Sequence, residues 1–84
     1  YGKNRKINAQ IHCRIAECLN NQGKSKQAIL EYQKILDGYP ESKFCDESLY
    51  KIDMIYSQNK QYDEAAKIFE KIEKNYPNSK YVNS

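Results

Sequence analysis

Ile, Leu and aromatic residues recur every three or four positions along the chain, which is the period of an α-helix with one apolar face. Turn-forming residues interrupt this pattern: Gly23 allows a left-handed turn, and Pro40 and Pro77 exclude helix at the residues before them. The pattern therefore predicts an all-α fold. The predicted helices span about residues 4–21, 25–37, 43–58 and 61–75, and the start of a further helix follows at 80–84.

Each predicted helix carries one apolar stripe that we expect to face a core. Ser25 and Ser42 stand where N-caps are expected, and residues four apart predict the ion pairs Glu47–Lys51, Asp63–Lys67 and Glu70–Lys74. The stripes predicted to face inward are Ile7, Ile11, Ile15, Cys18 and Leu19, then Ala28, Ile29, Tyr32, Ile35 and Leu36, then Leu49, Ile52, Ile55 and Tyr56, and finally Ala65, Ile68, Phe69 and Ile72.

The chain repeats itself. The stretch AILEYQKILDGYPES, residues 28–42, returns 37 residues later as AAKIFEKIEKNYPNS, residues 65–79. Such a period is typical of solenoids, in which antiparallel helix hairpins stack into a right-handed superhelix with a concave face. A closed four-helix bundle would not require two of its helices to match. We expect a single unit, residues 1–84, cut from a longer array, with repeats at about 4–40 and 41–77 and the stub of a further helix at 78–84.

The composition agrees with a soluble domain and narrows the possible partners. Of the 84 residues, 39% are hydrophobic and 30% charged, which is too polar for a membrane span and too apolar for disorder. The net charge is +3, and most of the basic excess precedes Glu31. No pattern of aromatic and Arg residues accompanies it, so we expect neither nucleic-acid binding nor direct membrane insertion.

The repeated residues resemble the tetratricopeptide repeat (TPR) family. That family's hairpin has a small residue, an aromatic residue and a terminal Pro in its second helix, matched here by Ala28, Tyr32 and Pro40 and again by Ala65, Phe69 and Pro77. First-helix positions match as Ile15 and Leu19, then as Ile52 and Tyr56. Asp53 departs from the pattern, because the family has a small residue there, and a carboxylate at a close helix crossing needs a partner or a wider crossing.

The 37-residue period with Tyr-Pro-x-Ser joins is similar to a bacterial TPR subgroup that includes the periplasmic Tol-Pal-associated coordinator and the outer-membrane assembly lipoprotein. This resemblance implies a setting in the bacterial cell envelope or periplasm. The three cysteines, an odd number, favour a reducing, cytoplasmic setting as the alternative.

Candidate chemistry is sparse. Cys13, Cys18, Cys45 and His12 lack the spacing of a metal or thiol site, so we interpret the cysteines as buried hydrophobes or half-exposed free thiols. No nucleophile and base pair, glycine-rich phosphate loop or pair of inward carboxylates is apparent. We therefore expect a non-enzyme without a cofactor.

The resemblance implies a concave groove lined by the first helix of each hairpin. Cys13 and Glu17 stand where chaperone-tail-binding members have Lys and Asn, so we expect no carboxylate clamp but a peptide or partner helix, anchored on Tyr50 and Met54. The alternatives are that Tyr50 packs across its hairpin, and that the repeats form a structural spacer or a self-association segment. The predicted groove residues are Gln10, Cys13, Glu17, Asn20, Glu47, Tyr50, Met54 and Ser57.

The two ends of the stack are expected to lack neighbours. Ile7 and Ile11 would be uncovered at one end, and Ile68 and Ile72 at the other, because repeats of this kind bury their apolar faces against one another. The sequence therefore also predicts marginal stability or an end-to-end homo-oligomer.

Overall fold

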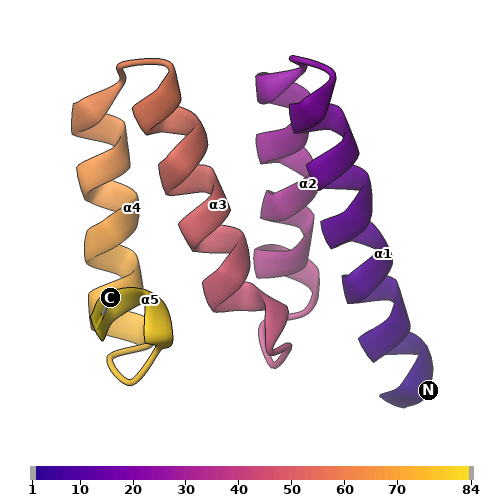
Figure 1. Cartoon of the computed structure of the whole chain (residues 1–84). Coiled ribbons are helices and arrows are strands. Elements are labelled where there is room, and N and C mark those ends of the chain that lie inside the picture. The colour runs from indigo at the N-terminus through magenta and orange to yellow at the C-terminus, as the bar shows by residue number, and fades with distance from the viewer. Residues whose placement is uncertain (1, 84) are drawn as a thin grey trace.

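The chain is built of helices joined by short turns in the computed structural model, which describes residues 2–83 (Figure 1). No strand occurs among these residues, and the predicted all-α solenoid is confirmed. The first helix begins two residues earlier than predicted, and the bounds of the next three agree to within one residue. The helices are α1 (Gly2–Asn21), α2 (Ser25–Gly38), α3 (Phe44–Gln58), α4 (Tyr62–Asn75) and α5 (Lys80–Asn83).

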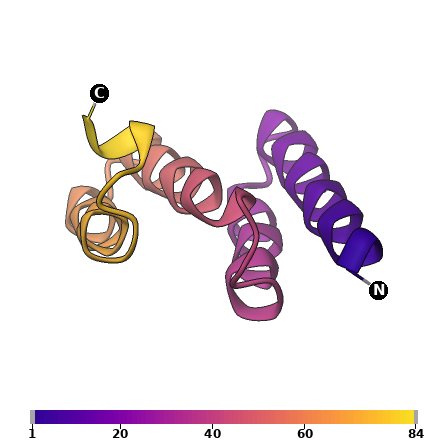
Figure 2. The same ribbon diagram turned by 90° about the horizontal axis from the view of Figure 1, so that it is seen from below.

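Two antiparallel hairpins, α1–α2 and α3–α4, stand side by side and are joined by the packing of α2 against α3. Seen along the helices, the chain forms two layers, with α1 and α3 in one layer and α2 and α4 in the other (Figure 2). The short α5 returns to the layer of α1 and α3. The described part of the chain measures 39 × 31 × 19 Å.

The sequence repeat is also a backbone repeat. The residues before α2 and α4, Lys24 and Gln61, have φ and ψ of −93° and 65° and of −93° and 66°. The residues that follow these helices, Tyr39 and Tyr76, have −135° and 57° and −136° and 61°. Helices α2 and α4 therefore begin and end in equivalent conformations 37 residues apart.

The turns between the helices of each hairpin also match. Gly23 has a φ of +82°, which confirms the predicted left-handed turn, and Lys60, at the equivalent position, has a φ of +63°. In both turns, the residue after the left-handed one donates its backbone N–H to the carbonyl five residues earlier. Lys24 donates to Leu19 at 2.9 Å, and Gln61 donates to Tyr56 at 2.8 Å.

The predicted caps and ion pairs were partly wrong. Ser25 is the first residue of α2 and does not cap it, because the N-cap position belongs to Lys24. Ser42 lies one residue before the N-cap of α3, although its Oγ accepts a hydrogen bond from the N–H of Phe44 at 3.0 Å. Lys67 approaches Glu64, at 3.7 Å, rather than Asp63.

The core lies between the two layers and holds Tyr32, Ile35, Ile52 and Ile55, each at most 1% exposed. Leu49 and Ile72 are buried as predicted, whereas Tyr56, Ile68 and Phe69 are only partly buried. The expectation that Ile72 is uncovered at the end of the stack was therefore wrong. Ser57 donates a hydrogen bond of 3.5 Å to Asp53, which is partly exposed and so avoids the burial of an unpartnered carboxylate.

The inward face of α1 was predicted wrongly. Ile7, Ile11 and Ile15 are 52%, 48% and 41% exposed, and Cys18 is exposed as well. The residues that α1 buries are Ala9, Cys13 and Ala16, at 0%, 3% and 0% exposure. These small side chains allow α1 to approach α2 closely, while the larger isoleucines lie on the opposite side of the helix.

Candidate functional site

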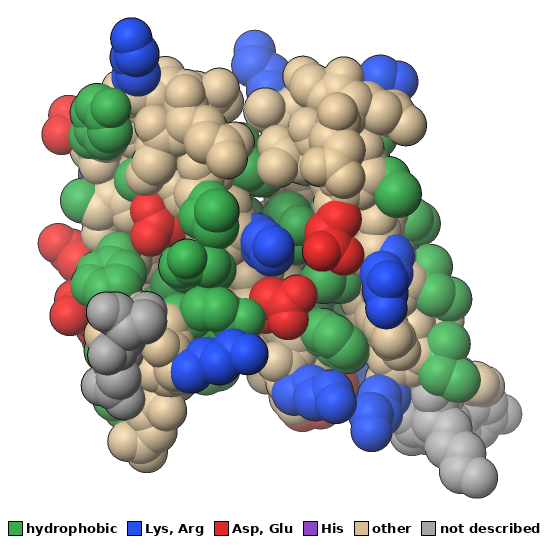
Figure 3. Space-filling view, in the orientation of Figure 1, with side chains coloured by type: hydrophobic (Ala, Val, Ile, Leu, Met, Phe, Trp, Pro, Cys, Tyr) green, Lys and Arg blue, Asp and Glu red, His purple; other side chains and the backbone are tan. Residues whose placement is uncertain are grey.

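The layer formed by α1 and α3 presents the face on which the groove was predicted (Figure 3). On this face, apolar side chains gather over α3, and charged side chains of both signs lie between α3 and α1. Such a surface is suited to a ligand with both apolar and polar groups.

Cys13 and Glu47 connect the two helices of this layer. The Sγ of Cys13 donates a weak hydrogen bond of 3.5 Å to Oε2 of Glu47. Burial and, to a smaller extent, the nearby Glu47 carboxylate together raise the pKa of Cys13 to about 12, so the thiol is neutral at physiological pH. Because Cys13 is only 3% exposed, it belongs to the core beneath the groove and not to its surface.

Glu17 lies in the same neighbourhood as this pair. Its charge, together with that of Glu47, contributes to the raised pKa of Cys13 and of Tyr32, for which burial is the largest cause. The charge of Lys51 acts on Cys13 in the opposite direction. This part of the predicted groove thus has two partly buried carboxylates with a lysine close by.

Tyr50 is covered on one side by the start of the next helix. Its ring stacks on that of Tyr81 in α5, with centroids 4.3 Å apart and planes inclined by 18°. Both residues are partly buried. Tyr81 stands 37 residues after Phe44, and Tyr50 stands 37 residues after Cys13. The stacked pair is therefore equivalent in the repeat to Cys13 and Phe44, and Phe44 packs against the core cluster that includes Cys13.

The remaining groove residues are spread along the layer. Met54 is 38% exposed and lies one helical turn beyond Tyr50. Asn20 and Ser57 are equivalent residues at the turn ends of α1 and α3, where their carbonyls accept the N–H of Gly23 and Lys60. Gln10 and Glu17 also line a hollow of about 620 Å³ along the outer side of α1, together with Ile7, Ile11 and Ile15.

Two polar groups beside the groove were missed by the sequence reasoning. Ser79 donates a hydrogen bond of 2.8 Å to Oδ2 of Asp46 and accepts one of 3.2 Å from the N–H of Tyr81. This pair holds α5 against α3. No local pattern in the sequence relates Asp46 to a residue 33 positions later.

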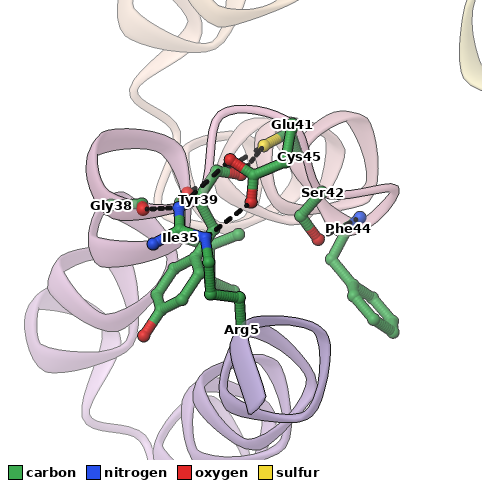
Figure 4. A network of polar contacts seen from close by, with 8 residues as sticks. All are labelled: Arg5, Ile35, Gly38, Tyr39, Glu41, Ser42, Phe44 and Cys45. Atoms are coloured by element: carbon green, nitrogen blue, oxygen red, sulfur yellow. Dashed lines mark hydrogen bonds and ion pairs between the residues drawn. The ribbon is translucent and has the colours of Figure 1, made fainter. Parts of the chain in front are cut away.

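Arg5 fastens the start of α1 to the join between the hairpins (Figure 4). Its guanidinium donates to the carbonyl of Gly38 at 2.7 Å and to both carboxylate oxygens of Glu41 at 3.1 and 3.3 Å, and it lies 4.9 Å from the ring centre of Tyr39. The hydrogen bonds and charge of Arg5 lower the pKa of Glu41. Part of the basic excess of the N-terminal region is thus used within the fold.

Cys45 also contacts the join between the two hairpins. Its Sγ is fully buried and donates a hydrogen bond to the carbonyl of Tyr39 at 3.1 Å.

A separate polar contact connects α1 to α2. Nδ1 of His12 lies 2.9 Å from Oε1 of Glu31, and the other carboxylate oxygen of Glu31 accepts a hydrogen bond from Lys34 at 2.7 Å. These contacts fasten α1 to α2 and hold the join between the hairpins.

The cysteines agree with their interpretation as free thiols, since Cys13 and Cys45 are buried and Cys18 is exposed. Among the residues that the structure describes, no group of three His, Cys, Asp or Glu side chains is placed to hold a metal ion. Within residues 2–83, no helix is both long and apolar enough to cross a membrane.

Comparison with known proteins identifies the family. The sequence matches the family described as SNAP, soluble NSF attachment protein, over residues 2–83. No curated protein and no solved structure matches the chain significantly. The matched family consists of α-helical, TPR-like repeats of the protein-interaction type, in agreement with the hairpins and the open α1–α3 face. The chain belongs to the SNAP family, that of the soluble NSF attachment protein.

Proposed function

We propose that the chain is a non-catalytic interaction module that binds a peptide or a partner helix on the α1–α3 face. The observation that carries the proposal is the stack of Tyr81 on Tyr50, in which a ring from another segment lies flat against α3. A surface that accepts this ring within the chain has the shape to accept an apolar or aromatic side chain of a ligand.

Met54 extends this surface. It is the flexible, exposed neighbour of Tyr50 on α3, and a thioether side chain adapts to ligands of different shape. Glu17, Glu47 and Lys51, each partly buried, supply polar groups that can orient a peptide backbone or pair with its charges. The ligand is therefore a segment with apolar side chains and charges of both signs.

Other ligand classes have less support. A terminal-carboxylate clamp of the TPR kind has Lys and Asn at the positions of Cys13 and Glu17, where this chain has a buried thiol and an acid. Nucleic-acid binding depends on basic groups, and two of these, Arg5 and Lys34, are already paired with Glu41 and Glu31.

A structural spacer or self-association segment is the second candidate. The same Tyr50–Tyr81 stack favours it, because the anchor is then filled by the chain itself. In that case the α1–α3 face carries no ligand, and Met54 is an ordinary surface residue.

A displayed library of random peptides separates the two candidates. Peptides selected for binding to the 84-residue chain are then tested for their affinity to two variants, Met54→Ala and Leu30→Ala. The Leu30→Ala variant is the control, because Leu30 is an exposed apolar residue on α2. We expect Met54→Ala to weaken binding by about 1 to 2 kcal/mol, while Leu30→Ala has no effect. A library that yields no binder, or binders insensitive to Met54, favours the spacer.

The cellular setting is a separate proposal. The Tyr-Pro-x-Ser joins resemble those of the bacterial envelope subgroup of TPR proteins, so we propose an envelope setting, with a cytoplasmic one as the alternative because of the three free thiols. Fractionation of cells that carry the tagged parent protein distinguishes them: recovery in the periplasmic or membrane fraction supports the first, and recovery in the cytosol supports the second.

A further inference from the structure

The outer face of α1 has the pattern of a packed surface but is open. Ile7, Ile11 and Ile15 follow one another at single-turn spacing and are 52%, 48% and 41% exposed. The residues 37 positions later, Phe44, Ser48 and Ile52, form the corresponding face of α3. Ser48 and Ile52 are 0% and 1% exposed, because α2 packs against that helix. The open face of α1 is therefore equivalent to a face that a second-layer helix covers elsewhere in this chain.

Helix α4 has the complementary open side. On α2, Glu31 contacts His12 of α1, and Ile29 lies roughly 160° around the helix axis from it, on the side of α3. On α4, Ala66 is equivalent to Ile29, and Phe69 is equivalent to Tyr32. Ala66 is exposed. Phe69 is partly exposed, whereas Tyr32 is only 1% exposed.

Tyr62 extends this side by a further turn and is 64% exposed. Tyr62, Ala66 and Phe69 thus form an apolar stripe on α4, which we call the α4 stripe. Ile7, Ile11 and Ile15 form the α1 stripe.

We propose that copies of this chain associate head to tail, with the α4 stripe of one copy packed on the α1 stripe of the next as α2 packs on α3. The interface continues one that already exists within the chain, at the same 37-residue register. Neither stripe contains Tyr50 or Met54, the proposed anchor of the groove, so the inference does not depend on the proposed ligand binding.

Charge favours this pairing over contact between two α1 helices. Lys3, Arg5, Lys6 and Arg14 against Glu17 give α1 a charge of +3. Asp63, Glu64, Glu70 and Glu73 against Lys67, Lys71 and Lys74 give α4 a charge of −1. The head-to-tail contact joins opposite charges, whereas two α1 helices repel each other.

Helix α5 limits the strength of the contact. Its residues 80–83 stand 74 positions after residues 6–9 of α1, so α5 lies where residues 6–9 of an incoming α1 would pack. The Ser79–Asp46 hydrogen bond and the Tyr50–Tyr81 stack must open before the full contact forms. The association is therefore weak, and because the contact is heterologous it does not stop at two copies.

Sedimentation equilibrium of the 84-residue chain over a wide concentration range tests the proposal. The weight-average mass is expected to rise continuously above the 9.9 kDa of one chain. Ile11→Glu on the α1 stripe and Ala66→Arg on the α4 stripe should each lower the association constant by about tenfold or more. Leu30→Glu, at an exposed position on α2, is the matched control and should leave it unchanged. Circular dichroism verifies that each variant is folded.

Mixing the two variants distinguishes the geometries. Ile11→Glu retains an intact α4 stripe and Ala66→Arg an intact α1 stripe, so an equimolar mixture should form a one-to-one complex that grows no further. A wild-type chain that is monomeric at every concentration overturns the proposal. So does a mixture that remains monomeric, or Ala66→Arg alone forming a dimer, which would indicate contact between two α1 helices.

Discussion

Lys60 adopts, 37 positions after Gly23, the left-handed backbone conformation that Gly23 has in the first hairpin, with a φ of +63° against +82°. Glycine enters this region without steric cost, whereas a residue with a Cβ atom does not. The second hairpin therefore carries a local backbone cost that the first avoids.

Lys60→Gly should stabilise the fold by about 0.5 to 1 kcal/mol, because relief of the left-handed strain exceeds the extra entropy of glycine in the unfolded chain. Urea unfolding followed by circular dichroism measures the change. Gly23→Ala is the reverse substitution at the equivalent position. No atom lies within 4 Å of the added Cβ, so the expected loss of about 1 kcal/mol of folding stability comes from the backbone conformation alone. Equal stabilities for Lys60→Gly and wild type would contradict this account.

The three thiols should react in a fixed order. Cys18 is exposed and should react first with a chromogenic disulfide, while Cys13 and Cys45 are buried and have raised pKa values, chiefly because of that burial. Since the thiolate is the reactive species, we expect these two to react at least about tenfold more slowly in the native state. Mass spectrometry of the partly modified chain identifies the site. Simultaneous modification of all three thiols under native conditions would show that the core opens as readily as the surface.

Glu31 should make stability depend on acid pH. The hydrogen bond from Lys34 lowers the pKa of this carboxyl most, and His12 lowers it further, against the opposing effect of burial. The pKa of Glu31 is lower in the folded than in the unfolded chain, so the ionised carboxylate stabilises the fold. This contribution to the free energy of unfolding is complete above the pKa of the unfolded chain, about 4.3, and is lost as the pH falls through the pKa of the folded chain.

Glu31→Gln should therefore cost about 1 kcal/mol at pH 7 and little at pH 2, as measured by urea unfolding at both values. Glu70→Gln, at an exposed position of α4, is the control and should change neither. A Glu31→Gln effect of equal size at both pH values would assign the loss to packing and not to the ionised carboxylate.

Tyr81→Ala tests whether the chain's own ring competes for the groove. The substitution removes the stack on Tyr50 and should cost at most about 1.5 kcal/mol of stability, because α5 is short and lies at one end. If Tyr50 anchors a ligand, peptides selected on the wild-type chain should bind this variant more tightly. Lys80→Ala, at the exposed neighbouring position, controls for general loosening of α5. Unchanged affinity in Tyr81→Ala would favour the spacer.

The bounds of α2, α3 and α4 could be predicted to within one residue because the signals that end them are local. Gly23 and the two Tyr-Pro joins act on their immediate neighbours, and their repetition at 37 residues reinforced each position. The buried face of α1 could not be predicted in the same way. Its isoleucines and its small residues both recur at helical spacing, and periodicity alone does not tell which face packs.

The same ambiguity affected the groove. Cys13 was expected in the groove because the resemblance to TPR proteins places the first helix of each hairpin there, and the isoleucine stripe of the same helix was expected to be the core. The signal in the sequence was the run of small residues at helical spacing in this helix, Ala9, Cys13 and Ala16, which are at most 3% exposed in the structure. The Tyr50–Tyr81 and Arg5–Glu41 contacts join residues 31 and 36 positions apart and required the three-dimensional arrangement.

The most direct test of the proposed function is a titration of the isotope-labelled chain with a library-selected peptide, followed by two-dimensional NMR of the backbone amides. The account predicts that the largest shifts gather on α1 and α3 around Glu17, Glu47, Tyr50 and Met54. Shifts centred on Leu30 and the outer surfaces of α2 and α4, with the α1–α3 face unaffected, would contradict it.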